Sequence, residues 1–197
     1  MKLYSKDLEY AYSIRKYIIA VCWVFILSIV IGLIVSFNNP GLSENYLESF
    51  KTSFGWIKSL DPIVIMAVIF LNNALKSLIA IVLGLGFGII PILFIAGNGV
   101  VLSILADIVS KEHSAIFVIA AILPHGIIEV PMVIISAGIG LRLGHVVFLS
   151  LKGVKTDIGS ELRTGVGFYM RIILPLLFVA AMVETFVTPL VAFRFMT

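Results

Sequence analysis

Long apolar segments alternate with shorter polar segments along this chain. Five apolar runs of about 20 residues or more are separated by short polar or amphipathic stretches. A helix rises 1.5 Å per residue, so about 20 apolar residues cross a hydrocarbon core of about 30 Å. The pattern predicts an all-α polytopic membrane helix bundle, a single integral membrane domain over residues 1–197. The expected transmembrane helices are residues 17–37, 62–83, 89–109, 114–141 and 166–190.

Three of the polar stretches carry apolar residues at helical spacing, which is typical of amphipathic helices in the membrane interface. The first is residues 2–16, for which a solvated basic terminus is the alternative interpretation. The second is residues 42–60, with Trp56 expected at headgroup level. The third lies within residues 142–165. The glycine-rich residues 84–88 are expected to reverse the chain between the second and third spans.

Composition and charge support a membrane protein and exclude several other classes. Hydrophobic residues make up 60% of the chain and charged residues 13%, with a mean hydropathy of +1.15. A soluble domain has about 25% charged residues. The net charge is +3, but no basic run is interleaved with aromatics in a polar context, so we expect no nucleic-acid binding. Nucleotide-binding loops, CxxC pairs and the HExxH and GxSxG motifs are absent from the sequence, which disfavours an ATP-driven machine or a standard serine hydrolase acting alone. We expect a non-enzymatic protein.

The distribution of Lys and Arg predicts an orientation in the cell membrane. Residues 2–16 and 142–165 are the basic segments, and five spans place both on the same side. The positive-inside rule then predicts a cytoplasmic N-terminus and an external C-terminus. Arg194 at the C-terminus opposes this assignment.

The transmembrane segments also contain polar residues, which are costly in hydrocarbon and normally face the interior of a bundle. His125 and Glu129 share one helix face at i, i+4, and Pro124 and Pro131 beside them are expected to break that helix. We expect polar residues of four spans to meet in one buried cluster. Its predicted members are Asn72, Asn73, Lys76, Asn98, His125, Glu129 and Glu184.

Three interpretations of this cluster are open. It fixes the bundle as a structural element, since polar residues often hold membrane helices together. Alternatively, His125, Glu129 and Glu184 bind a divalent metal such as zinc, which accepts imidazole nitrogen and carboxylate oxygen. In the third interpretation the cluster is a proton or substrate path, as broken helices with ionisable residues indicate in transporters. An intramembrane metallohydrolase is a further candidate that would use the same residues.

Two other features bear on packing. Gly138, Gly140 and Gly144 are expected to permit close helix contact, within the fold or at a dimer interface. Arg171, in the first turns of the last span, is expected to reach the headgroups. The expected partners are therefore the lipid bilayer, a second copy of the chain and other membrane proteins.

Residues 123–144 (LPHGIIEVPMVIISAGIGLRLG) resemble the signature segment of the stage II sporulation protein M family, a group of small multi-span membrane proteins. Asn72-Asn73, Asn98-Gly99 and residues 180–189 (AAMVETFVTP) fit the same pattern, whereas Ser103 departs from the small residue expected there. The resemblance implies a scaffold or localiser in a membrane complex. In endospore-forming bacteria it implies partners that degrade peptidoglycan during engulfment; elsewhere it implies only a fold and a site.

Overall fold

A computed structural model describes residues 2–39, 41, 48, 52, 55, 60–112 and 115–194. These residues form helices and turns and contain no strand, and five of the helices are long and apolar enough to cross a membrane. The all-α membrane bundle with five spans is thereby confirmed. The amphipathic helix expected at residues 42–60 lies almost entirely outside the described residues.

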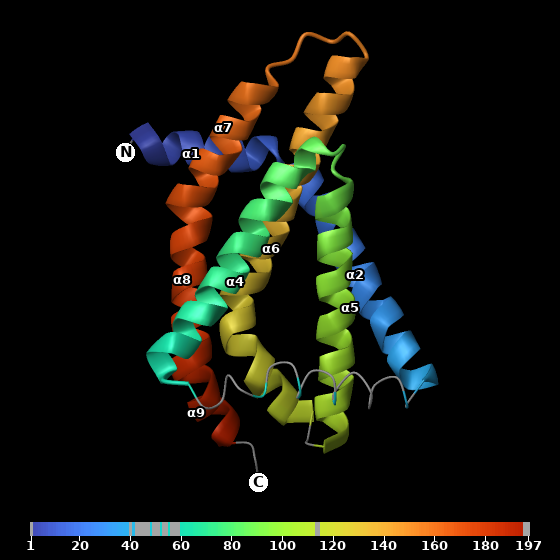
Figure 1. Cartoon of the computed structure of the whole chain (residues 1–197), viewed down its shortest axis with the longest axis vertical. Helices are drawn as coiled ribbons and strands as arrows, with labels where there is room; N and C mark the ends of the chain where they lie inside the picture. Colours follow the sequence, from blue (N-terminus) through green and yellow to red (C-terminus); the bar gives the residue numbers. More distant parts are fainter. Residues whose placement is uncertain are drawn as a thin grey trace.

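The chain enters and leaves the bundle at opposite ends, as an odd number of spans requires (Figure 1). Helix α1 crosses one end of the bundle, and the long helices run between the two ends. The last span consists of three α-helical segments joined by two π-helical segments. The elements in order are α1 (Lys2–Ser13), α2 (Arg15–Asn38), α4 (Pro62–Val82), the 3₁₀ turn η2 (Leu83–Leu85), α5 (Ile89–Glu112), α6 (Ala115–Leu151), α7 (Ile158–Phe168), π-helix η3 (Tyr169–Ile173), α8 (Leu174–Met182), π-helix η4 (Val183–Val187) and α9 (Thr188–Phe193).

Helix α6 is the central element of the bundle, since it contacts α2, α4, α5, α8 and α9. It continues to Leu151, beyond the predicted end of the fourth span at residue 141. The last span begins at Ile158, where the Asp157 side chain caps α7 by accepting a hydrogen bond from the Ser160 amide at 2.9 Å. The polar segment expected over residues 142–165 is therefore mostly helical, with a short connection at residues 152–157.

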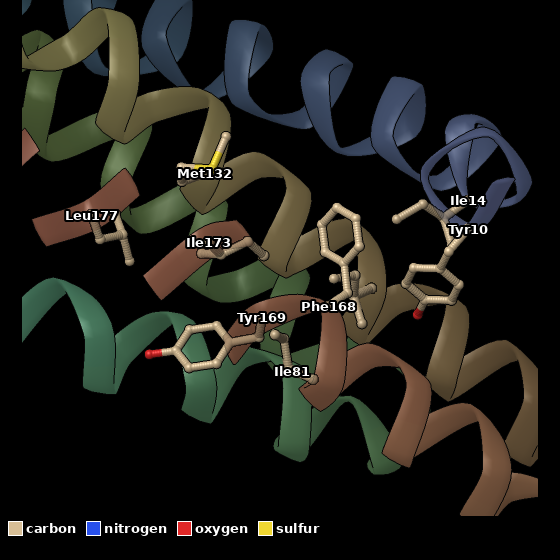
Figure 2. Close-up of a cluster of buried hydrophobic side chains, with 9 residues drawn as sticks. Tyr10, Ile14, Ile81, Met132, Phe168, Tyr169, Ile173 and Leu177 are labelled. Carbon is tan, nitrogen blue, oxygen red and sulfur yellow. The ribbon is translucent and has the colours of Figure 1, made fainter. Parts of the chain in front are cut away.

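Helix α1 is packed against the end of the bundle and is not a solvated terminus. Tyr10 and Ile14 are buried, and Figure 2 shows both beside Phe168 from α7. The Tyr10 and Phe168 ring centroids are 5.6 Å apart. The apolar side of α1 thus completes a core that also includes residues of α4, α6 and η3.

Polar side chains fix α1 at the edge of this core. The Arg142 guanidinium pairs with the Glu161 carboxylate at 2.8 Å and also donates a hydrogen bond to the Ser13 hydroxyl. The Tyr10 hydroxyl donates to the same carboxylate at 3.1 Å. Burial and the neighbouring Glu161 carboxylate raise the pKa of the Tyr10 phenol, so the phenol stays neutral and remains a donor. These bonds also explain why α6 and α7 extend beyond the predicted spans, because their polar residues find partners.

Glycines allow α6 to contact its neighbours backbone to backbone. A β-carbon on Gly84 would collide with the backbone of Gly140, and one on Gly144 would collide with the backbone of Gly88. Residues 83–88 form the expected reversal, with Gly88 at φ +75°, a conformation that favours glycine. Gly140 and Gly144 are therefore used within the fold.

Candidate functional site

The candidate site is centred on Glu129, in the bent part of α6. The helix continues through Pro124 and Pro131, so it is bent rather than broken as the sequence had suggested (Figure 1). A proline removes one backbone hydrogen bond and displaces the preceding turn, which is sufficient for a bend without ending a well-packed helix. The bend brings Glu129 to the part of α4 that carries the two asparagines.

Two amides of α4 lead to the carboxylate of Glu129. The Asn72 side chain donates a hydrogen bond to the Asn73 side-chain oxygen at 3.3 Å. The Asn73 side chain is close enough to Glu129 to influence its carboxylate, for which an amide is a suitable donor. These side chains place polar groups of α4 beside one half-buried acidic side chain of α6.

Two ionisable side chains act on Glu129 from other positions. The ammonium group of Lys76, one turn after Asn72 on α4, is close enough to attract the carboxylate. Glu184 in η4 is close enough for the two carboxylates to repel each other. The structure therefore brings three of the four described helical segments predicted to contribute to the cluster, α4, α6 and η4, together at Glu129.

Helix α5 contributes Asn98, which lines a cavity beside Glu129. The cavity has a volume of about 90 Å³, and Gly126 also lines it. The Asn98 amide donates to the Phe94 carbonyl of its own helix at 2.8 Å, which leaves its side-chain oxygen as an acceptor. The space exceeds that needed for one water molecule. The remaining lining residues are apolar: Phe25, Ile95, Leu102, Val130 and Val133.

The cluster is only partly buried. Glu129, Glu184 and Asn73 are half-buried, but Asn72, Lys76 and Asn98 are exposed. On α4 the buried face is formed by small and apolar residues such as Ala74, Ser77 and Ala80, so Asn72 and Lys76 fall on the outer side. The prediction that all of these polar residues face the interior is wrong for the three exposed ones.

The predicted metal set remains a prediction. The side chain of His125 lies outside the described part of the structure, although its backbone is in α6. Among the side chains that are described, no group of three His, Cys, Asp or Glu residues is arranged to hold a metal ion. Glu129 and Glu184 are close to each other and could contribute two carboxylates.

The backbone at Glu184 has a feature that residue spacing does not reveal. Residues Val183–Val187 form a π-helix, and the Thr188 hydroxyl donates to the Val183 carbonyl at 3.3 Å. Single-turn π segments occur frequently at functional sites. The Thr185 hydroxyl in this segment is buried and has no protein hydrogen-bond partner within the described part of the chain.

A second polar group lies near the end of α5 and was missed in the sequence. The buried Asp107 carboxylate accepts hydrogen bonds from Ser36 at 2.5 Å and from Lys111 at 2.6 Å. The i, i+4 spacing of Asp107 and Lys111 is the signal that could have indicated it. Because the group links α2 to α5 through satisfied bonds, it is a structural connection.

Comparison with protein-family models identifies a family over most of the chain. The family model described as "Stage II sporulation protein M" matches residues 21–189, which is most of the chain. No curated protein and no solved structure matches it.

Proposed function

The chain belongs to the stage II sporulation protein M family, and on this premise we propose that it is a membrane scaffold that recruits other membrane proteins. Its multi-pass membrane character follows from the family and from the five apolar helices.

The observation that carries the proposal is a set of exposed polar side chains at bilayer depth. Asn72 and Lys76 are exposed near the middle of the span Pro62–Leu85, and Asn98 is exposed near the middle of Ile89–Lys111. Asn72 and Asn98 each donate one hydrogen bond within the chain, which leaves further amide donors and acceptors that would face hydrocarbon. Such exposure is unfavourable, and in membranes polar groups normally pair with other polar groups. A transmembrane helix of another subunit with an amide or hydroxyl side chain would supply those partners.

The rigidity of the surrounding bundle supports the same role. Backbone contacts at Gly84, Gly140 and Gly144 hold α4, the following turn and α6 at close distance. The exposed polar side chains of α4 therefore belong to a helix whose position relative to α6 is fixed. A surface of fixed geometry suits a scaffold.

Photocrosslinking in native membranes tests the proposal. We expect p-benzoylphenylalanine at position 72 to give a discrete protein adduct, and Lys76→Leu to reduce it several-fold, because a partner helix would cover both positions. Position 31 on α2 is the control, since Ile31 is 55% exposed on an apolar helix face. An adduct of twice the chain mass would identify a homodimer. Adducts of equal yield from positions 72 and 31, or none from either, would contradict partner recruitment.

An ion-binding or transport role, and an intramembrane metallohydrolase, are the alternatives that the cavity beside Glu129 brings into consideration. For a scaffold, we expect purified protein to contain no stoichiometric zinc and proteoliposomes to show no pH-dependent ion flux above protein-free liposomes. Elemental analysis and a flux assay measure these. Flux that Glu129→Gln abolishes, or zinc that His125→Ala removes, would replace the scaffold by one of the alternatives.

A further inference from the structure

The guanidinium of Arg171 uses only one of its edges. Its Nη2 and Nε atoms donate to the two carboxylate oxygens of Asp7 at 2.6 and 3.2 Å. The Nη1 atom has no hydrogen-bond partner among the described residues, and the Arg171 side chain is 43% exposed. Gly167 has no side chain to fill the space at Nη1. Two N–H groups of a permanent cation are therefore open to a ligand.

An apolar groove lies directly beside this ion pair. It has a volume of about 120 Å³ and is lined by Asp7, Leu8, Ala11, Phe168 and Ile172. Phe168 is buried and closes the groove on the side of α7, whereas Leu8 on α1 is 60% exposed. Asp7 belongs both to the groove and to the ion pair, so the free edge of the Arg171 guanidinium and the apolar space are neighbours.

The exposed side chains of α1 indicate where in the bilayer this groove lies. The helix crosses the end of the bundle (Figure 1) and exposes Leu8, Tyr12 and the basic side chain of Lys6. Arg15, the first residue of α2, is also exposed. The Arg15 guanidinium lies 3.9 Å from the centre of the Tyr12 ring. A helix with exposed apolar, aromatic and basic residues lies at the boundary between acyl chains and headgroups. At this depth the groove meets the phosphate layer of the bilayer.

We infer that the groove between α1 and the α7–η3 junction binds one anionic glycerophospholipid. The lipid phosphate accepts hydrogen bonds from the free Nη1 of Arg171, and an acyl chain lies over Phe168 between α1 and η3. The Asp7–Arg171 pair is neutral as a unit. At this end of the chain the exposed cations Lys6, Arg15 and Lys16 outnumber the exposed anion Glu9, and this excess of positive charge favours an anionic headgroup over a zwitterionic one. The apolar groove distinguishes a lipid from free phosphate, because only a lipid fills both parts of the site.

Native mass spectrometry of the full-length protein in detergent tests this with dioleoylphosphatidylglycerol. Arg171→Lys keeps a cation for Asp7 but loses the second edge, and Ala11→Phe fills the groove without removing a charge. We expect each to weaken lipid retention by at least about tenfold, the effect of losing a charge-assisted hydrogen bond or the space for a chain. Lys155→Gln, which removes an exposed cation from the α6–α7 connection, is the control and is expected to retain the lipid.

Two further measurements make the result decisive. Melting of each variant without lipid separates loss of the site from loss of the fold, and only variants that melt as the unmodified protein are compared. Equal retention by the unmodified protein, Arg171→Lys and Ala11→Phe would overturn the inference. So would equal retention of phosphatidylcholine, or competition by inorganic phosphate as effective as that by the lipid. A protein adduct that protects the groove in native membranes would also overturn it, in favour of a partner segment.

Discussion

Replacing Gly140 with alanine is expected to destabilise the bundle by about 3 kcal/mol, at the upper end of the usual cost of overpacking. The added methyl group would meet the Ala80 carbonyl oxygen and the Pro91 ring, and a backbone carbonyl cannot rotate away as a side chain can. Thermal melting in detergent, followed by the folded peak in size-exclusion chromatography, should show a decrease of roughly 10 °C.

Gly97→Ala is the matched control, because it makes the same chemical change on a neighbouring helix. A β-carbon at Gly97 meets no atom within 4 Å. Alanine is the better helix former, so this variant should melt at the original temperature or slightly above it. A Gly140→Ala protein that melts with the control would mean that α4 and α6 separate easily, and the fixed surface proposed for the scaffold would lose its support.

Replacing Arg142 with methionine is expected to cost about 3 kcal/mol, because the Glu161 carboxylate would remain in a largely buried position without its cation. The side chains of Arg142 and Glu161 are 23% and 12% exposed. The change would also release Ser13 and loosen α1, so melting should occur at lower temperature and trypsin should cleave the N-terminal segment faster.

The double variant identifies the cause of that loss. Arg142→Met combined with Glu161→Gln removes both charges, and we expect it to be more stable than Arg142→Met alone, as a double-mutant cycle would detect. Arg163→Met is the control, since Arg163 is exposed on α7 and its loss should change stability by less than about 0.5 kcal/mol. If the double variant were the least stable of the set, packing of the Arg142 side chain would be the main contribution, and charge pairing would be minor.

Part of the candidate site could be predicted from residue spacing. Asn72 and Lys76 lie on one face of α4 at i, i+4, and the sequence placed Glu129 and Glu184 in spans that pack together. Spacing could not reveal that Asn73 is the amide beside Glu129, or that Asn98 lines a cavity next to it. These facts depend on how far each helix is rotated about its axis, which is set by packing against neighbours.

The role of Arg171 could also be predicted only in part from the sequence. Its position early in the last span predicted a side chain reaching the headgroups, but its partner Asp7 is 164 residues away in the chain. The π-helix before Leu174 and the docking of α1 put the two side chains together. No local pattern in the sequence carries this information.

The amino-acid sequence was sufficient to predict the class of protein, the number of spans and the chain reversal at residues 84–88. These depend on local quantities: the length of an apolar run against the thickness of a bilayer, and the backbone preferences of glycine. The packing of the helices was needed to show that α6 bends without breaking, that three polar residues of the cluster face outward, and that α1 closes one end of the bundle. In a membrane the helices are apolar on all sides, so the hydrophobic pattern does not specify which sides face each other. Close packing and polar pairs between distant residues specify them instead.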